Sequence, residues 1–594
     1  MKTAGFAELE MKKTALNQKY CIGLNKGLHH ASVCLSPVGG PPEESQIFLK
    51  ERFTRIKGVG SPIDGLLAMP EVLESADEDG ALIAESSYGE RPALVEDELE
   101  RKTGYFKLLE TLDLRRKGLL KFFSRYNPEV RFLSHHYCHA RAAAALSPYS
   151  KALILVADGV GSNAKIFDPG HREISGSFAP AECRYSPTGV TAESVTVYLQ
   201  ERSQLRCVHK EWQQITKSGL KPKSDGLGAL YAWAASYIFN SGLASGKVMG
   251  LAAYGTPAKI KNRADFFERL GWDKSFKGVS KEEWEQDGKF RFYADAAASV
   301  QSHFEESLLI LIRKMKDAFP DVGNLILTGG CALNCVANMK AFDKGLFSSI
   351  YVPPFPGDES ISFGAAQALR ADVLGSHWAP LAWERQVPNF GPEQSAPTPA
   401  AIKAAFKGMP ARELGDPADA AARLLAKGKI VGWFQGRSES GPRALGCRSI
   451  LAAPGTKGLR DDLNRRIKKR ESFRPYGCSV LWERAHEYFA APRGFESPFM
   501  SFAPAIRAPW REALSEVAHI DGTSRIQTVR AEQNPLFHRL IEKFGLRAGT
   551  HCVLNTSLNV AGEPLAETLA DLRRFFESAP VDCVIAGNIL IQRA

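Results

Sequence analysis

Two histidines stand four residues apart at the start of an alanine-rich segment, HHYCHARAAAA (135–145). On a helix, residues i and i+4 lie on the same face, so the imidazoles of His135 and His139 can contact one metal ion. Two ligands do not complete a metal site, and such a pair on a helix can equally be structural. With His136 between them, an exposed polar patch is a further alternative. The spacing alone indicates a metal site without establishing one.

Two aspartates are candidates for the remaining ligands. Asp158 directly follows the apolar segment ALILVA (152–157), and Asp358 comes shortly after SIYVPP (349–354). In α/β folds, polar residues just past the ends of strands line the ligand crevice. Two imidazoles and two carboxylates suit Fe(II), Mn(II) or Zn(II) and leave coordination positions open for a ligand.

Three glycine-rich segments form a second set of candidates: DGVG (158–161), GKVMGLAAYG (246–255) and TGGCALN (328–334). Glycine lets the backbone approach a phosphate closely, and successive N–H groups can bind anions. None of the segments matches the P-loop or the Rossmann fingerprint, and most glycine pairs are simply turns. Three such loops beside strands nevertheless resemble the actin/Hsp70/sugar-kinase fold, in which two lobes hold ATP. The candidate nucleotide contacts are Gly159, Gly161, Lys247, Gly329, Gly330 and Asn334.

The second half of the chain carries a dense basic region in two segments, GRSESGPRALGCRS (436–449) and NRRIKKRESFRP (464–475). Arginine side chains bind phosphate and carboxylate oxygens through paired N–H donors, so this region is suited to anions. Its arginines stand among glycine, proline and small residues, which favours a pocket for a small phosphorylated molecule. The basic residues are Arg437, Arg443, Arg448, Arg465, Arg466, Lys468, Lys469, Arg470 and Arg474.

Two other interpretations of this basic region stay open. A nucleic-acid surface would need interleaved aromatic residues for stacking, and Phe473 and Tyr476 are the aromatic residues close by. A solvated helix face is the expected environment of Arg465, Arg466 and Lys469. Further candidate anion contacts downstream are Arg525, Asn555, Ser557 and Asn559.

Size and composition place these segments in an ordinary globular chain. With 594 residues it should form at least two domains, because single cores seldom exceed about 250–300 residues. The 11 cysteines are scattered, which suits free thiols in a reducing compartment, and no apolar run reaches the roughly 20 residues that span a bilayer. Residues 1–19 lack the apolar core of a secretory signal and are expected to be a flexible leader. We therefore expect a cytoplasmic protein. Its net charge of +10 is compatible with nucleic acid and with anionic small molecules.

Strand-like and helical segments alternate along the chain, which is typical of an α/β architecture. Five prolines between residues 380 and 399 are typical of a linker. Strands are expected over 21–24, 152–157, 324–329, 349–354, 429–436, 551–559 and 582–592, and helices over 139–146 and 304–319. We expect one domain over 20–379, a linker over 380–399 and a second domain over 400–594.

In this order, the motifs resemble the O-carbamoyltransferases of nodulation-factor, cephamycin and tobramycin biosynthesis. The resemblance covers nearly the whole chain from about residue 20, and the ordered set is far more specific than any single motif. The matching segments are GLHHASVCL, HHYCHARAAAA, LVADGVG, GKVMGLAAYG, LTGGCALNCVAN, PPFPGDES, VGWFQGRSESGPRALGCRSIL, LNRRIKKRESFRPYGCSV, SPFM, HIDGTSRIQTV and VLNTSLNVAGEP.

The resemblance implies an actin/Hsp70-like, two-lobed first domain and a YrdC-like second domain, both of α/β class. It implies that the second domain converts ATP and carbamoyl phosphate into carbamoyl adenylate with release of pyrophosphate. The first domain would hold this adenylate at Fe(II), with Mn or Zn as alternatives, while a hydroxyl of a small natural product attacks. Mg²⁺ could accompany ATP, and the chain could form a homodimer. The segments do not identify the acceptor.

Site residues follow from the motif positions. His135, His139, Asp158 and Asp358 fall on the metal-ligand positions of the family. His29 falls on its general base, although a capping or buried structural histidine would look the same without the resemblance. The resemblance assigns carbamoyl phosphate to Arg443, Arg448, Lys468 and Asn555, with Arg443 and Lys468 catalytic, and the nucleotide also to Arg525 and Ser557.

The chain departs from the family pattern at several of these motifs. His30 replaces an aspartate after the general base, Cys447 replaces an asparagine, and Ser472 replaces a proline. Tyr476, Gly477 and Cys478 also differ. The charged positions persist, so we expect an active enzyme.

Two other functions stay open. A tRNA-modifying carbamoyl or threonylcarbamoyl transferase would bind tRNA with a steep salt dependence. An actin-like sugar kinase would release ADP instead of pyrophosphate, and it would leave the basic region of the second half unexplained.

Overall fold

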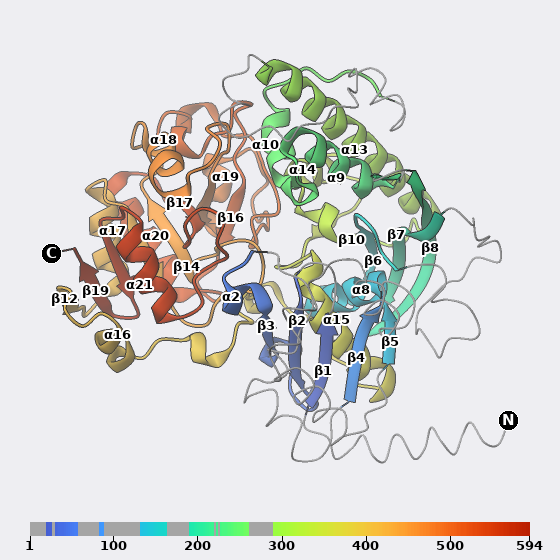
Figure 1. The fold of residues 1–594 in the computed structure, drawn as a ribbon, viewed down its shortest axis with the longest axis horizontal. Helices are drawn as coiled ribbons and strands as arrows, with labels where there is room; N and C mark the ends of the chain where they lie inside the picture. The colour runs from blue at the N-terminus through green and yellow to red at the C-terminus, as the bar shows by residue number, and fades with distance from the viewer. Residues whose placement is uncertain are drawn as a thin grey trace.

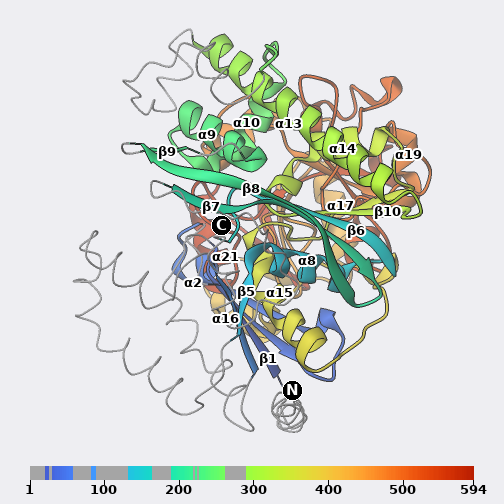
Figure 2. The ribbon, with the colours of Figure 1, turned by 90° about the vertical axis from the view of Figure 1, so that its right-hand side faces the viewer.

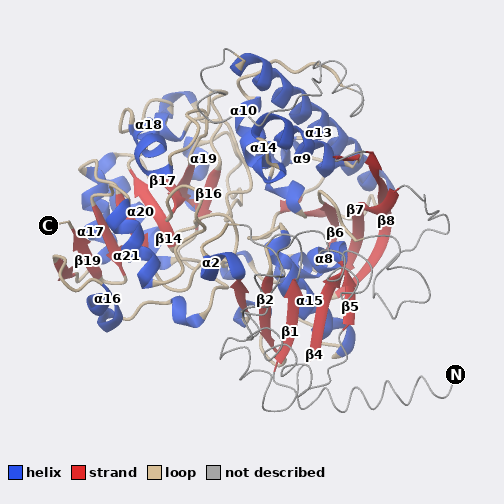
Figure 3. Ribbon diagram, viewed as in Figure 1, coloured by secondary structure: helices blue, strands red, loops and turns tan. Residues whose placement is uncertain are grey.

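The computed structural model describes residues 20–25, 30–57, 82–87, 131–162, 189–218, 221–223, 226–260 and 289–593. Three β-sheets organise these residues. Figure 1 shows the first two sheets on one side of the molecule and the third, formed by the C-terminal part, on the other. Helices pack around all three sheets (Figure 3), so the predicted α/β class is confirmed. The finer actin/Hsp70-like and YrdC-like assignments stay predictions.

The first sheet has five strands in the order β3-β2-β1-β4-β5. β1 pairs antiparallel with β2 and parallel with β4. Helix α15 (Ile361–Ala368) crosses β1 so closely that a Cβ atom on Gly23 would lie 1.8 Å from the carbonyl oxygen of Ser362. Glycine is therefore required at this crossing. The strands are β1 (Tyr20–Asn25), β2 (Ser32–Pro37), β3 (Gln46–Leu49), β4 (Leu82–Ser87) and β5 (Arg131–Ser134).

The second sheet has six strands in the order β11-β10-β6-β7-β8-β9. β6 pairs parallel with β10 and antiparallel with β7. Alternate residues of β6 point to opposite faces: Leu153 and Leu155 pack with the helices seen above the sheet in Figure 2, whereas Ile154 and Val156 join the core between the first two sheets. The strands are β6 (Lys151–Ala157), β7 (Gly189–Glu201), β8 (Gln204–Ser218), β9 (Lys221–Lys223), β10 (Asn324–Thr328) and β11 (Ser349–Tyr351). The helices are α9 (Leu227–Phe239), α10 (Ser245–Ala252), α13 (Phe290–Ala318) and α14 (Cys335–Asp343).

Helix α8 (His135–Leu146) connects the first sheet to the second, and all its residues are buried. The hydroxyl of Ser134 caps it by accepting a hydrogen bond from the backbone N–H of Tyr137. Its alanines favour a helix and let neighbouring elements approach closely. Because the histidines of this helix are buried, the alternative of an exposed polar patch is wrong.

The third sheet has eight strands in the order β12-β19-β18-β13-β14-β17-β15-β16. Helices α17 and α20 pack together over one face. The strands are β12 (Ala411–Glu413), β13 (Val431–Phe434), β14 (Arg448–Ala452), β15 (Gly477–Leu481), β16 (Ile526–Val529), β17 (Cys552–Ser557), β18 (Cys583–Ala586) and β19 (Ile589–Gln592). The helices are α16 (Pro399–Ala405), α17 (Pro417–Ala426), α18 (Leu459–Asp462), the π-helix η9 (Leu463–Lys468), α19 (Ala485–Tyr488), α20 (Pro535–Ala548) and α21 (Leu569–Ser578).

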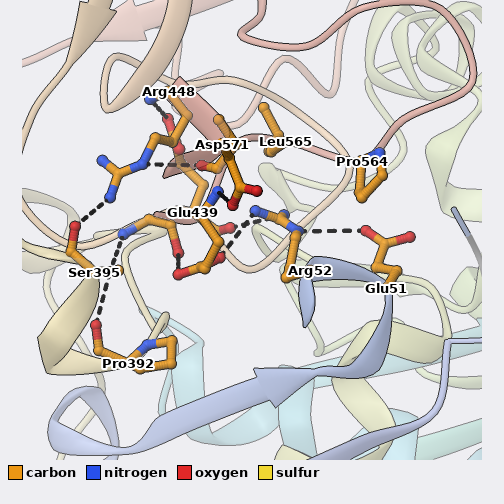
Figure 4. Close-up of polar contacts among 12 residues, drawn as sticks. Glu51, Arg52, Pro392, Ser395, Glu439, Arg448, Pro564, Leu565 and Asp571 are labelled. Carbon is orange, nitrogen blue, oxygen red and sulfur yellow. Dashed lines mark hydrogen bonds and ion pairs between the residues drawn. The ribbon is translucent and has the colours of Figure 1, made fainter. Parts of the chain in front are cut away.

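A short helix from the N-terminal part, α2 (Lys50–Thr54), docks onto the C-terminal part through two arginines. The Arg52 guanidinium donates to the carbonyl oxygen of Glu439 at 3.0 Å (Figure 4). The guanidinium of Arg55, which directly follows α2, donates to the carbonyl oxygen of Leu565 at 2.8 Å. These bonds hold the two parts of the molecule together beside the basic region.

The proline-rich segment 380–399 is fixed by backbone hydrogen bonds to both parts. The N–H of Ile47 donates to the carbonyl oxygen of Phe390 at 2.7 Å, and the N–H of Gly391 donates to that of Ser438 at 3.1 Å. Phe390 is fully buried. The segment is therefore packed between its neighbours, while the predicted domain boundaries around it stay predictions. Among the residues described, no helix combines the length and the apolar character needed to cross a membrane.

Candidate active site

The four predicted metal ligands converge on one buried point. His135 Nε2 lies 3.2 Å from His139 Nε2 and 3.1 Å from Asp158 Oδ2. It also lies 3.3 Å from Asp358 Oδ1. One ligand atom from each of the four side chains lies within 4.8 Å of the others. We call this group the metal quartet; its donor atoms are those that divalent iron, manganese or zinc prefers.

Hydrogen bonds on the outer side of the quartet hold its side chains in place. His139 Nδ1 lies 3.0 Å from the hydroxyl of Ser360, and the N–H of Gly330 donates to Asp158 Oδ1 at 3.0 Å. Metal-binding imidazoles and carboxylates in proteins are usually oriented by such outer contacts. The residues present therefore fit a divalent transition metal, although their role as ligands stays a prediction.

The electrostatics of the quartet also favour a cation. Burial disfavours the charged imidazole of His135, but the carboxylates of Asp358 and Asp158 outweigh burial and raise its pKa to about 10. Burial also opposes the charge of Asp158, yet the hydrogen bond with His135 keeps the pKa of this carboxyl below its usual value. Two carboxylates thus attract positive charge to one point, and a divalent ion would supply it.

Two of the predicted glycine loops meet beside the quartet, at the ends of β6 and β10. Gly159 and Gly161 follow β6, and a Cβ atom on Gly329, which has a φ of 84°, would lie 2.3 Å from the carbonyl oxygen of Ala157. Gly330 contacts Asp158 as described. In this conformation the N–H groups of Gly161, Gly329 and Gly330 already have acceptors within the protein. Nucleotide contact by the four glycines stays a prediction.

The other two predicted nucleotide contacts in the first part have partners within the protein. Asn334 caps helix α14 by accepting from the N–H of Ala337 at 3.1 Å, and its amide donates to Gln301 at 2.9 Å. Lys247 lies 2.6 Å from the carboxylate of Glu471, across the contact between the two parts. Both side chains hold local structure in this conformation.

Lys468 lies at the end of η9 with its ammonium among oxygen atoms of the segment that follows β17. It donates to Ser557 Oγ at 3.1 Å, to Asn559 Oδ1 at 2.6 Å and to the carbonyl oxygen of Asn559 at 3.0 Å. Burial, with added repulsion from Arg470, lowers its pKa well below the ordinary value. The predicted residues Lys468 and Ser557 are therefore in direct contact.

Several cations gather around this lysine. Burial lowers the pKa of Arg525 to about 9, and the positive charges of Arg443 and Arg474 add to this effect. The charges of Arg474 and Arg443 also reach Lys57, an exposed residue of the N-terminal part. Lys57 interacts with Lys468 as well. We call Lys57, Arg443, Lys468, Arg474 and Arg525 the cationic cluster. Such a concentration of positive charge is suited to an anion, and anion binding here stays a prediction.

Two predicted carbamoyl-phosphate contacts lie outside this cluster. Arg448 is fully buried, with its guanidinium 3.6 Å from the centre of the Phe434 ring (Figure 4 shows its surroundings). Its Nη2 donates to the carbonyl oxygen of Ser395 at 2.7 Å, and its Nη1 to that of Gln435 at 2.8 Å. Backbone carbonyls thus occupy the guanidinium in this structure, and contact of Arg448 with carbamoyl phosphate stays a prediction.

Asn555 is likewise fully buried, inside the third sheet. Its amide donates to Ser479 Oγ at 2.9 Å and to the carbonyl oxygen of Ala444 at 3.1 Å. The NH₂ group of Asn555 thus joins β17 to β15 and to the segment before β14, and contact of Asn555 with carbamoyl phosphate stays a prediction.

The general base predicted by resemblance, His29, lies outside the described residues. Its neighbour His30 has a φ of 54° and places its Nε2 3.6 Å from the carboxylate of Glu359. Asn25 donates to the carbonyl oxygens of both His30 and Asp358, at 2.9 and 3.1 Å. The segment that carries the predicted base is thus tied to the segment that carries a metal-quartet aspartate.

Of the departures from the family pattern, Cys447 has a defined environment. Its sulfur accepts a hydrogen bond from the Asn389 side chain at 3.1 Å, and its backbone N–H donates to Glu439 at 2.8 Å. This thiol therefore lies beside the 380–399 segment and away from the metal quartet. Nothing in the structure explains Ser472, which is exposed.

Sequence reasoning missed two sets of residues around these sites. Lys57 carries no motif, and its proximity to Arg443 depends on how α2 docks. Glu193 and Lys210 pair behind the metal quartet, and both lie on strands that no sequence pattern had indicated. A charged residue within an otherwise mixed strand is usually solvent-exposed, so the sequence offered no signal for either.

Comparison with known proteins identifies the chain. The family model described as the carbamoyltransferase N-terminus matches residues 72–367, and the one described as the carbamoyltransferase C-terminus matches residues 422–593. The chain belongs to the carbamoyltransferase family. The resemblance inferred from the ordered motifs is thereby confirmed.

Relatives within this carbamoyltransferase family include two nodulation proteins and a cephem O-carbamoyltransferase. The chain is 32% identical over 509 residues to nodulation protein NolNO of Sinorhizobium fredii, covering 80% of this chain and 66% of that protein. It is 30% identical over 478 residues to nodulation protein NolO of Bradyrhizobium diazoefficiens, covering 78% of this chain and 79% of that protein. It is 32% identical over 366 residues to 3'-hydroxymethylcephem-O-carbamoyltransferase of Amycolatopsis lactamdurans, covering 59% of this chain and 65% of that protein. The chain therefore spans less than two thirds of the length of NolNO and of the cephem enzyme.

Proposed function

We propose that this carbamoyltransferase makes carbamoyl adenylate from ATP and carbamoyl phosphate and transfers its carbamoyl group to a hydroxyl of a small molecule. One observation carries the proposal: Glu359 has neighbours in both the metal quartet and the cationic cluster. This residue follows the quartet aspartate Asp358, pairs with His30, and interacts electrostatically with Arg443 of the cluster. A product of the first site would therefore form close to the second.

The cationic cluster suits the first step, which gathers several phosphate groups in one place. Water first cleaves carbamoyl phosphate into carbamate and inorganic phosphate. A carbamate oxygen then attacks the α-phosphorus of ATP, and pyrophosphate leaves. Lys468 faces neutral oxygen acceptors of Ser557 and Asn559, so a phosphate oxygen would be a stronger partner for it. Arg443 and Arg525 would stabilise the negative charge that develops on the leaving group.

The metal quartet suits the second step, the attack of a hydroxyl on the carbamoyl carbon. A divalent ion held by His135, His139, Asp158 and Asp358 would act as a Lewis acid for the bound adenylate. His29 would accept the proton of the hydroxyl, since an imidazole titrates near neutral pH.

The test is to incubate the full chain with Fe(II), Mg²⁺, ATP and carbamoyl phosphate and to measure pyrophosphate. We expect pyrophosphate that depends on carbamoyl phosphate, with no acceptor required for its formation. Formation of ADP upon addition of sugars would instead indicate a kinase. Lack of carbamoyl-phosphate-dependent pyrophosphate in the metal-loaded protein would contradict the proposal.

A further inference from the structure

A buried ion pair lies behind the metal quartet. Glu193 on β7 and Lys210 on β8 approach to 2.5 Å, and both side chains have no exposed surface. Removing two charges from water is costly, and a buried pair seldom repays that cost in stability. A pair retained in such a place therefore calls for a role beyond stabilising the fold.

The Glu193 carboxylate joins two segments that are far apart in the first part of the chain. Its Oε1 accepts from the hydroxyl of Ser134 at 2.8 Å, the residue that caps α8. Its Oε2 accepts from the N–H of Ser162 at 2.9 Å and from the N–H of His136 at 3.4 Å. One carboxylate thus holds the first turn of α8 and the loop after β6.

These two segments each carry a residue of the metal quartet. His135 begins α8, and Asp158 begins the loop after β6. Ser162 completes the link, because its hydroxyl accepts a hydrogen bond from the N–H of His135 at 2.8 Å. The backbone of Glu193 contributes as well: its carbonyl oxygen accepts from the N–H of Gly161 at 2.9 Å.

We propose that Glu193, neutralised by Lys210, is a positioning residue that sets the distance between His135 and Asp158 and so prepares the quartet for its metal. The inference rests on the metal site of the proposed function. Burial opposes ionisation of Glu193, but Lys210 outweighs burial and lowers the pKa of this carboxyl to about 2. An ionised carboxylate can accept from all four donors at once, whereas an amide in its place would offer a single acceptor atom.

The test uses Co(II) as the probe, because its visible absorption reports the geometry of the bound ligands and its titration gives an affinity without any activity assay. In Glu193→Gln the side chain keeps its size but loses charge and one acceptor. We expect Co(II) affinity to fall by about 10–100-fold and the absorption band to change, as for other residues that orient metal ligands. Ser162→Ala, a milder change, should weaken Co(II) binding in the same direction and by less.

A matched control residue, Asp372, contacts helix α8 from another segment. Asp372 pairs with Arg141 of α8 and accepts from the Tyr137 hydroxyl at 2.7 Å, on a side of the helix away from the quartet. Asp372→Asn should disturb α8 and leave the affinity and spectrum of Co(II) unchanged. If both variants weaken Co(II) binding equally, the role of Glu193 is structural only, and the proposal is overturned.

Two further outcomes distinguish failure of the positioning role from failure of the metal site. Wild-type Co(II) affinity and spectrum in both Glu193→Gln and Ser162→Ala would overturn the positioning role and leave the metal site intact. Absence of Co(II) binding by the wild-type chain would overturn the metal site and the positioning role together. If Glu193→Gln does not fold, Ser162→Ala decides between these results.

Discussion

The Nε2 atoms of His135 and His139 face each other at 3.2 Å, inside a helix whose residues are all buried. At this distance at most one proton can lie between the two nitrogens. Asp158 and Asp358 approach the same nitrogens from two other segments. Imidazole nitrogens and carboxylates directed at one buried point form the environment that a divalent cation requires.

Loss of one imidazole should remove the metal and spare the first reaction. In His139→Ala we expect the affinity for iron to fall by at least about 100-fold, since three of the four predicted ligands remain. Bound iron is measured after reconstitution and gel filtration. Pyrophosphate formation should persist, because the cationic cluster is intact. His209→Ala, on β8 and paired with Glu211, is the control and should bind iron normally. Normal iron binding by His139→Ala would exclude the quartet as the metal site.

Loss of the Lys468 ammonium should abolish pyrophosphate formation. The side chain is buried, and it lies near other positive charges, among them Arg474 of the cationic cluster. We expect a decrease of at least about 1,000-fold in the rate with ATP and carbamoyl phosphate. Arg465 lies on the same π-helix with its side chain 80% exposed, so Arg465→Ala should retain the wild-type rate. Equal effects of the two substitutions would argue against a specific role for Lys468.

Arg448 and Arg443 should differ in what their loss affects. Arg448→Met leaves backbone carbonyls of Ser395 and Gln435 unpaired inside the C-terminal part, so we expect the free energy of unfolding to fall by about 3 kcal/mol or more. Arg443→Met should instead raise the KM for carbamoyl phosphate with a small change in stability. Urea unfolding and steady-state kinetics measure the two effects. A raised KM for carbamoyl phosphate in a fully stable Arg448→Met protein would instead support contact of Arg448 with carbamoyl phosphate.

The Glu193 carboxylate should give the protein a defined acid sensitivity. Its pKa in the folded protein, about 2, lies below the ordinary value of 4.5, so its ionised form stabilises the fold. This contribution, on the order of 3 kcal/mol, is present above about pH 4.5 and is lost as the pH falls from there through 2. The difference in free energy of unfolding between wild type and Glu193→Gln should therefore shrink between pH 6 and pH 3. A difference that is constant with pH would show that the charge contributes no stability.

Arg52 of α2 and Arg55, which directly follows this helix, should hold the N-terminal part to the C-terminal part. Arg52 is buried and contacts Glu567 as well as the backbone of Glu439. Arg52→Met should lower the free energy of unfolding by roughly 2–4 kcal/mol, because carbonyl and carboxylate acceptors lose their donor. Thr54→Ala, at an exposed position of the same helix, should change it by less than about 0.5 kcal/mol. An unchanged midpoint of urea unfolding for Arg52→Met would contradict the assignment of the junction.

Much of the fold could be predicted because apolar segments specify strands locally. The segments 21–24, 152–157 and 324–329 fall in β1, β6 and β10. The segment 582–592 was taken as one strand, but it forms β18 and β19, since Gly587 turns the chain with a φ of 52°. The long hairpin of β7 and β8 was not predicted, because its strands mix charged and apolar residues.

The metal quartet could be predicted because each member had a local signal. The four-residue spacing identified His135 and His139, and the position after a strand identified the two aspartates. The cationic cluster could be predicted only in part. Whether an arginine faces a pocket or backbone carbonyls depends on packing, so Arg443 and Arg448 looked alike in sequence. Lys57 joins the cluster only through the docking of α2.

The most direct test of two sites acting in series follows the carbamoyl carbon. Carbamoyl phosphate labelled with ¹⁴C is mixed with ATP and the full chain, quenched within one turnover, and separated by chromatography. We predict that the label appears in a nucleotide, as carbamoyl adenylate, in the wild type. In His139→Ala this labelled nucleotide should accumulate, and in Lys468→Ala it should be absent. Label that never enters a nucleotide in the wild type or in His139→Ala would contradict the account.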